Sequence, residues 1–250
     1  MSYVRVERYE HTARVILDRP DKRNAMSSDV AAELAAAFLA LADEDYLRVV
    51  VLSGEGPSFC GGADVTELAS LTPETADSFI RGLHAAIAAA MLCPVPIIVA
   101  IRGACIGAGL ELAAGCDLRI ATHESRFSMP EVKVGVPSVI EAALLPRLMG
   151  RGRAARLVLT GETIDAATAR DWGLVEELVS DDDLMFRAGA LAAEIAEADP
   201  AAIRAQKRLI RAWDDMTIEQ AVEASVREFA DSYRTDAPRE RIAAAMAGRK

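Results

Sequence analysis

The chain has 250 residues, 52% of them hydrophobic, which is enough for a sizeable buried core without stabilising disulfides or metals. Lys and Arg number 28 against 38 Asp and Glu, a formal net charge of -10, which argues against sequence-independent binding to nucleic acid or to an anionic membrane surface. An anionic ligand would therefore have to be held by local donors.

The cysteines and the N-terminus indicate a reducing compartment. Cys60, Cys93, Cys105 and Cys116 form no CxxC pair and lie in apolar or Gly-rich surroundings, which predicts reduced, packed thiols. The N-terminal MSYVRVERYE is charged where a signal peptide needs an apolar core, and no run of about 18 apolar residues follows. We expect a cytoplasmic protein that does not bind membranes.

The first half of the chain alternates strands and helices. Residues 3–9 and 12–18 are β-branched runs that predict a hairpin, and Ser27 or Ser28 is expected to cap a helix that is followed by a buried strand at 48–54. After a Gly- and Pro-rich segment, a helical pattern to about residue 92 precedes a strand at 94–103, a short helix and a strand at 117–122.

The second half differs in pattern. From about residue 138 onward the sequence is almost wholly helical in character, and the acidic run Asp181 to Asp183 is expected to start a helix rather than to bind a metal. We therefore expect a mixed α/β core followed by a helical C-terminal region.

Two Gly-rich segments join strands to helices. IRGACIGAGLELAAG places a glycine turn before a helix whose first amides have no intrahelical partner, and SFCGGADV precedes another helical segment. Each motif alone is more often a packing feature. Together they can aim two N–H groups at one carbonyl oxygen, which is what enolate chemistry requires.

Two glutamates stand in settings that favour acid–base chemistry. Glu111 lies between apolar residues in the helix that begins at the glycine turn, and Glu131 directly follows Pro130. Most glutamates are solvated, but burial would raise the carboxyl pKa toward neutral pH. His11, His84 and His123 form no metal-binding motif, and we expect structural or surface roles for them.

These motifs carry a family resemblance. IRGACIGAGLELAAGCDLRIAT with the upstream SFCGGADVTEL and RPDKRNAMS resembles the crotonase (enoyl-CoA hydratase/isomerase) superfamily, in order and spacing from about residue 12 to 175. The resemblance implies a spiral of repeated ββα units over residues 1–195, with a helical region at 196–250 through which trimers form and pair into hexamers.

The resemblance also implies a site. The oxyanion hole maps onto the backbone N–H groups of Ala63 and Ala108, and the two catalytic glutamates onto Glu111 and Glu131. Coenzyme A, which is part of the substrate, is implied to contact Lys22, Arg23, Ala25, Gly61, Gly62, Asp64 and Val65. No metal or redox cofactor is expected.

Both glutamates together favour an enoyl-CoA hydratase that adds water across the 2,3 double bond. An isomerase or acyl-CoA hydrolase of the same family, or a catalytically idle member that only binds, remains the alternative. The sequence does not identify the acyl chain.

The sequence departs from the family pattern after Gly135, where VPSVIEAALLPRLMG lacks the usual glycines. In one interpretation Ser138 caps a helix and Glu141 completes a capping box. In the other, Val139 and Ile140 narrow the acyl pocket while Glu141 adds a third carboxylate, and a branched, cyclic or otherwise modified enoyl group is preferred over crotonyl.

Overall fold

The computed structural model describes residues 2–247 and contains a six-stranded and a three-stranded sheet. The larger sheet runs in the order β1-β2-β3-β4-β6-β9, with β1 and β2 antiparallel as the predicted hairpin and the other pairs parallel. Its strands are β1 (Val4–Arg8), β2 (Thr12–Leu17), β3 (Val49–Gly54), β4 (Ile97–Ile101), β6 (Leu118–Thr122) and β9 (Glu177–Val179).

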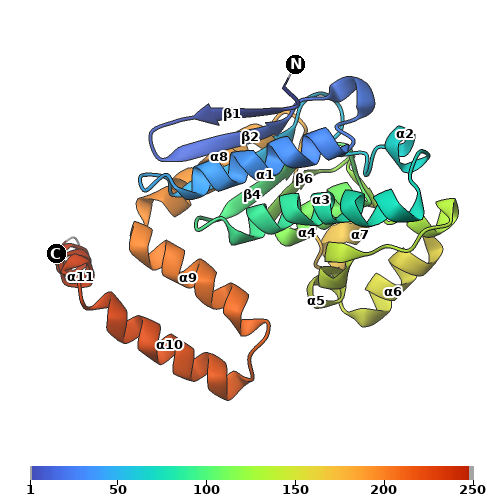
Figure 1. Cartoon of the computed structure of the whole chain (residues 1–250). Helices are drawn as coiled ribbons and strands as arrows, with labels where there is room; N and C mark the ends of the chain where they lie inside the picture. Colours follow the sequence, from blue (N-terminus) through green and yellow to red (C-terminus); the bar gives the residue numbers. More distant parts are fainter. Residues whose placement is uncertain (1, 248–250) are drawn as a thin grey trace.

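The central strands are buried on both faces, as their continuous apolar sequences predict. One face of β3 and β4 joins the main core under α1 (Ser28–Ala42) and α3 (Pro73–Leu92), and the opposite face packs against α8 (Leu184–Glu197). Figure 1 shows α1 and α3 side by side on one side of this sheet.

Capping residues fix where the long helices begin. The Ser27 hydroxyl accepts from the amide of Val30 at the start of α1, which confirms one of the two predicted caps. Thr72 and Thr75 form a capping box at the start of α3, and α8 begins at Leu184, directly after the acidic run, without a side-chain cap.

The smaller sheet was not predicted. It contains β5 (Ala104–Ile106), β7 (Arg126–Ser128) and β8 (Thr163–Asp165). Three residues are too few to show a period-2 pattern, so sequence periodicity does not reveal such strands. The expectation of an almost wholly helical chain after residue 138 is therefore wrong at β8 and β9.

Short helices connect these layers, and longer ones form the C-terminal region. The 3-10 helices are η1 (Pro20–Lys22), η2 (Glu131–Val134) and η3 (Ile140–Leu144). The remaining α-helices are α2 (Val65–Leu68), α4 (Ala108–Gly115), α5 (Leu145–Met149), α6 (Arg151–Thr160), α7 (Ala166–Asp171), α9 (Pro200–Trp213), α10 (Ile218–Ser232) and α11 (Ala237–Ala247). None of the helices within residues 2–247 is long and apolar enough to cross a membrane.

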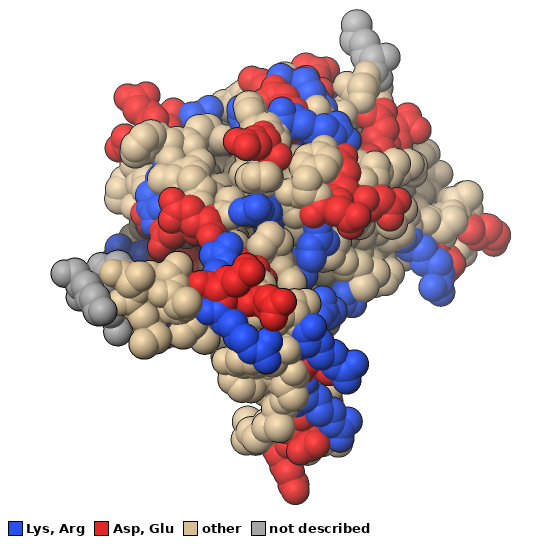
Figure 2. Space-filling view, turned by 90° about the vertical axis from the view of Figure 1, so that its left-hand side faces the viewer, with Lys and Arg blue, Asp and Glu red and all other residues tan. Residues whose placement is uncertain are grey.

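Helices α9 to α11 extend away from the sheets. Lys207 anchors α9, because its buried ammonium group donates to the Asp117 carboxylate and to the Val95 carbonyl, at 2.8 and 2.9 Å. The projecting α9–α10 segment forms the lower end of Figure 2, with Lys and Arg mainly along one side, uncharged residues along the other, and Asp and Glu at the tip. The predicted boundary between residues 195 and 196 lies in the last turn of α8, and a separate role for the region beyond it remains a prediction.

Candidate active site

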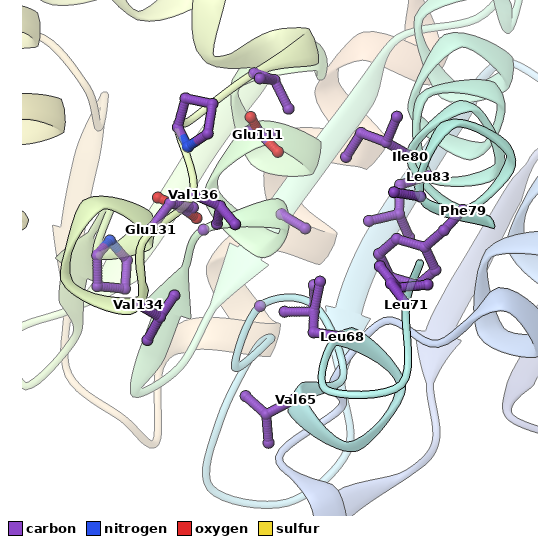
Figure 3. A pocket seen from close by; sticks show the side chains of 18 of the residues that line it. Val65, Leu68, Leu71, Phe79, Ile80, Leu83, Glu111, Glu131, Val134 and Val136 are labelled. Atoms are coloured by element: carbon purple, nitrogen blue, oxygen red, sulfur yellow. The ribbon is translucent and has the colours of Figure 1, made fainter. Parts of the chain in front are cut away.

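A largely apolar cavity of about 420 Å³ lies between α3, α4 and the turn that carries Glu131. Phe79, Ile80 and Leu83 of α3 line one side, and the first residues of α4 line the other. Figure 3 shows the Glu111 and Glu131 carboxylates across the cavity from these α3 side chains. The cavity therefore combines an apolar wall with a small number of polar groups, as ligand sites usually do.

Backbone pairing brings the two predicted Gly-rich segments together at this cavity. The Cys60 amide donates to the Ala104 carbonyl, and the Ile106 amide donates to the Cys60 carbonyl, both at 3.0 Å. A Cβ atom on Gly109 would lie 2.6 Å from the Cβ of Cys60. The missing side chain at Gly109 thus allows the start of α4 to pack directly against the upstream loop.

Ala63 and Ala108 both line the cavity. Ala108 is the first residue of α4, so its amide has no intrahelical acceptor. Among residues 2–247 no group accepts a hydrogen bond from the amide of either alanine. Two free amides from different segments therefore stand at one cavity, which is the arrangement expected for an oxyanion hole.

Glu111 is a buried carboxylic acid at the wall of this cavity. Its side chain projects from the first turn of α4, only 4% of the residue is exposed, and Oε1 accepts from the Ala142 amide at 3.1 Å. Burial, followed by the negative charges of Glu131 and Glu141, raises the pKa of Glu111 to about 8, against the opposing effect of the Ala142 hydrogen bond. Glu111 can therefore both take up and release a proton near neutral pH.

Glu131 begins η2, directly after Pro130, and also lines the cavity. Its Oε2 accepts from the Ser138 hydroxyl at 2.7 Å. This bond contradicts the predicted capping box, because the residue at the N-cap of η3 is Val139 and no side chain caps that helix. The capping interpretation therefore gave Ser138 the wrong partner, since spacing alone cannot distinguish a helix cap from a bond to another carboxylate.

The three residues after Ser138 have different environments. Val139 lines the cavity, whereas Ile140 packs against the core and Glu141 is buried beside His84. Ile140 and Glu141 are not among the described residues that line the cavity, so the predicted narrowing of the acyl pocket applies to Val139 alone. His84, predicted as structural or surface, pairs with this buried carboxylate through Nδ1 although 55% of its side chain is exposed.

Of the seven residues predicted to bind coenzyme A, Gly62 lines the larger cavity and the other six line a second, smaller pocket of about 200 Å³. Its lining includes Lys22, Arg23, Ala25, Gly61, Asp64 and Val65, and it shares Gly61, Ala63 and Val65 with the larger cavity. The amide of Gly61 donates to the Arg23 carbonyl and the amide of Met26 to the Gly62 carbonyl, both at 2.8 Å. The two pockets therefore adjoin along one tethered loop, with room for an elongated ligand.

The Asp64 side chain is engaged within the protein. Its carboxylate accepts from the amides of Thr66 and Glu67 at the start of α2, and forms an ion pair of 2.6 Å with Arg19. Burial raises the pKa of Asp64, but the Arg19 hydrogen bond and the two amides outweigh it, so the pKa lies below its usual value. This side chain fixes the loop conformation.

Comparisons with known proteins agree with this geometry. The family model described as enoyl-CoA hydratase/isomerase matches residues 7–246. A probable enoyl-CoA hydratase of Mycobacterium bovis is 33% identical over 96% of this chain and 93% of its own length. An (E)-benzylidenesuccinyl-CoA hydratase of Thauera aromatica is 34% identical over 88% of this chain and 86% of its own length.

A solved structure agrees as well. The crystal structure of enoyl-CoA hydratase from Bacillus anthracis superimposes with a TM-score of 0.95 at 28% identity, covering 98% of this chain and 96% of that one. The mixed α/β architecture, the two pockets and the matched residues thus agree with the predicted crotonase fold. The chain belongs to the enoyl-CoA hydratase/isomerase family.

Proposed function

We propose that this protein is an enoyl-CoA hydratase that adds water across the 2,3 double bond of an enoyl thioester. The observation that carries the proposal is the pair of glutamates, Glu111 and Glu131, at one cavity beside two amides without an acceptor. The hydratase names of several relatives support it. The reaction needs no metal or redox cofactor, because all its steps are proton transfers and addition to a polarised double bond.

The amides of Ala63 and Ala108 would bind the thioester oxygen. Two donors aimed at this oxygen draw electrons from the conjugated double bond, which makes C3 electrophilic, and they stabilise the enolate that forms after attack. Removing one such donor typically costs about 10²- to 10³-fold in rate. The apolar wall of α3 would strengthen these bonds by lowering the local dielectric constant.

The two glutamates would divide the proton transfers. Glu111 would hold water and take its proton as the oxygen attacks C3, and Glu131 would deliver a proton to C2. The pKa of about 8 at Glu111 makes it a stronger base than an ordinary carboxylate, once ionised. The hydroxyl of Ser138 would hold the Glu131 carboxyl in place.

The acyl-CoA substrate would span the two adjoining pockets, with coenzyme A along the loop of Lys22, Arg23 and Ala25 and the acyl group in the apolar cavity. Val139 lines that cavity in a segment without the family's usual glycines, which supports an acyl group other than crotonyl. The name of the Thauera aromatica relative, a hydratase of benzylidenesuccinyl-CoA, supports the same inference.

An isomerase is the second candidate, because the raised pKa keeps Glu111 largely protonated at pH 7 and so suits a proton donor. One experiment separates the candidates. A panel of straight, branched and cyclic 2-enoyl-CoA and 3-enoyl-CoA thioesters is incubated with the enzyme, and the products are identified by mass and by the absorbance of the conjugated 2-enoyl thioester. Gain of one water by a 2-enoyl thioester supports hydration, whereas an isobaric product from a 3-enoyl thioester alone would favour isomerisation. Release of the free CoA thiol would instead favour a hydrolase.

A further inference from the structure

Glu141 is a buried carboxylate that the proposed reaction does not use. Its Oε1 lies 2.6 Å from Nδ1 of His84 on α3, and the residue is only 6% exposed. Within residues 2–247 its buried Oε2 has no hydrogen-bond partner. A buried, half-satisfied carboxylate is costly for folding, which is a reason to look for a functional role.

The backbone before Glu141 is strained. Ile140 has a φ of 40°, in the left-handed region that β-branched residues rarely adopt. This residue begins η3, which presents both the Glu141 side chain and the Ala142 amide, and that amide donates to Glu111 at 3.1 Å. The strained turn thus connects the His84–Glu141 pair to one of the two glutamates of the site. Strain of this kind is often found at functional sites.

The charge of Glu141 acts on Glu111. Burial is the largest cause of the raised pKa of Glu111, and the charges of Glu131 and Glu141 add to it. Of the other charged groups on the packed helices, Asp77 pairs with Arg81 on α3 and Arg147 of α5 pairs with Asp214 and Asp215, whereas Glu74 lies in the first turn of α3. Among the described residues, His84 is the one basic side chain that forms an ion pair with any of the three glutamates.

We propose that Glu141 is a positioning residue whose negative charge, held in place by His84, favours the protonated form of Glu111 during the reaction. The inference rests on the proposed function, in which Glu111 takes a proton from water. In each turnover Glu111 gains a proton and Glu131 loses one, so the cycle is reset only if Glu111 is readily found in both forms. A third negative charge favours protonated Glu111, and the contact between His84 Nδ1 and Glu141 Oε1 fixes where that charge lies.

Glu141→Gln tests the inference because it keeps the shape of the side chain and removes the charge. The kcat/KM for the best enoyl-CoA is measured from pH 6 to pH 9. The limb of the profile that reports ionisation of Glu111 should move to lower pH, so that the ratio of kcat/KM at pH 6 to that at pH 9 rises about threefold or more. A merely structural role would lower both rates and leave the ratio unchanged, and that result would overturn the inference.

His84→Ala provides a second, independent variant. Without its partner the Glu141 side chain is no longer held in its buried position, so its effect on Glu111 should weaken and the ratio should change in the same direction. The double variant should show no more than the effect of Glu141→Gln, because both changes act through one charge. Additive effects would contradict the proposal. Should Glu141→Gln fail to fold, His84→Ala serves as the test. Glu124→Gln, which removes an exposed carboxylate in the turn after β6, is the matched control and should leave the ratio unchanged.

A substrate-free measurement separates this inference from the proposed function. Protein labelled with 13C at the glutamate side-chain carboxyl is titrated by NMR, and Glu111→Gln identifies the signal of Glu111. Glu141→Gln should lower the titration midpoint of that signal. An unchanged midpoint overturns the inference whether or not hydration is found, whereas a lowered midpoint in a protein that hydrates no enoyl-CoA upholds the electrostatic role and overturns the proposed function.

Discussion

The space that a side chain on Gly107 would occupy is filled by the Glu131 carboxylate. A Cβ atom built on Gly107 would overlap Glu131 Oε1, and the φ of this glycine is 50°, where other residues are strained. Gly107 also immediately precedes Ala108, whose amide is one of the two proposed oxyanion donors. The glycine thus allows the carboxylate and the donor to stand side by side.

Gly107→Ala is therefore expected to displace Glu131 and the Ala108 amide together. We expect kcat to fall by about 10²-fold or more, the scale seen when one oxyanion donor or acid–base partner is lost. Steady-state hydration kinetics on the best enoyl-CoA would measure this. Gly82→Ala on α3 is the matched control, because a Cβ there meets no atom within 4 Å and alanine is the better helix former, by about 1 kcal/mol. Equal kcat values in the two variants would contradict the assigned role of Gly107.

Glu111→Gln and Glu131→Gln should each lower kcat by about 10²-fold or more, with little change in the affinity for coenzyme A. The amide side chains keep the shape of the carboxyl groups and cannot exchange protons as they do. Loss of the conjugated enoyl absorbance measures turnover, and equilibrium binding of a saturated acyl-CoA measures affinity. A variant that retains near-normal turnover would remove that glutamate from the mechanism.

The raised pKa of Glu111 also makes the stability depend on pH. In the folded protein this pKa is about 8, against an ordinary value of 4.5 for an unfolded glutamate. Between these values the unfolded chain releases a proton that the folded protein keeps, so this group's contribution to the free energy of unfolding is full below about pH 4.5 and is lost as pH rises to about 8.

Glu111→Gln should abolish this pH dependence. Relative to the wild type, the variant should gain free energy of unfolding on the order of a few kcal/mol between pH 5 and pH 8. Urea denaturation at the two pH values gives both free energies. If wild type and variant change in parallel, the pKa of Glu111 is not raised by burial as inferred.

The parts of the fold that the sequence predicts well are those with long regular patterns. The β1–β2 hairpin, the buried strands β3 and β4 and the helices α1 and α3 carry clear periodicity or caps. β5, β7 and β8 do not, because each has only three residues and is formed by pairing between distant segments. Tertiary pairing rather than local preference decides such strands.

The sequence likewise predicts only part of the site. Glu111 and Glu131 could be singled out because their apolar or post-proline setting is local. The bond of Ser138 to Glu131 could not be predicted, because the same spacing also fits a helix cap. The bond of His84 to Glu141 could not be predicted either, because these residues are 57 positions apart in sequence. A serine or histidine in such a position more often has a capping or surface role. The position of Glu141 depends on how η3 packs against α3 and α4, and the local sequence does not encode this packing.

The C-terminal helices carry a prediction about assembly. Ile218 and Phe229 of α10 are 83% and 67% exposed, and several further apolar side chains of α9 to α11 are exposed as well. Exposed apolar surface of this extent is typical of a protein interface. We expect trimers, alone or paired as hexamers, and Phe229→Asp should shift them toward the 26.7 kDa monomer. Light scattering at micromolar concentration measures the mass, and a monomeric wild type would contradict the prediction.

The last prediction concerns the acyl group. Val139 lines the apolar cavity in a segment where the family usually has small residues, so it should restrict or reshape the space for the acyl chain. One methyl-sized group in such a pocket discriminates between substrates by about 1 to 3 kcal/mol, or roughly 10- to 200-fold in kcat/KM. We expect crotonyl-CoA to be a poor substrate and a branched, cyclic or otherwise modified enoyl thioester to be preferred.

Val139→Ala tests whether this side chain determines the preference. The kcat/KM for the preferred thioester is divided by that for crotonyl-CoA, and this ratio is compared between wild type and variant. It should change about tenfold in Val139→Ala. It should stay constant in the control Leu159→Ala, because Leu159 is a 74% exposed residue of α6. Substitution of Val139 leaves both glutamates and both proposed donor amides in place, so a loss of all activity would point to misfolding and not to specificity. A kcat/KM for crotonyl-CoA near the diffusional limit of about 10⁸ M⁻¹s⁻¹ would contradict the prediction, because no other substrate could then have a markedly higher kcat/KM.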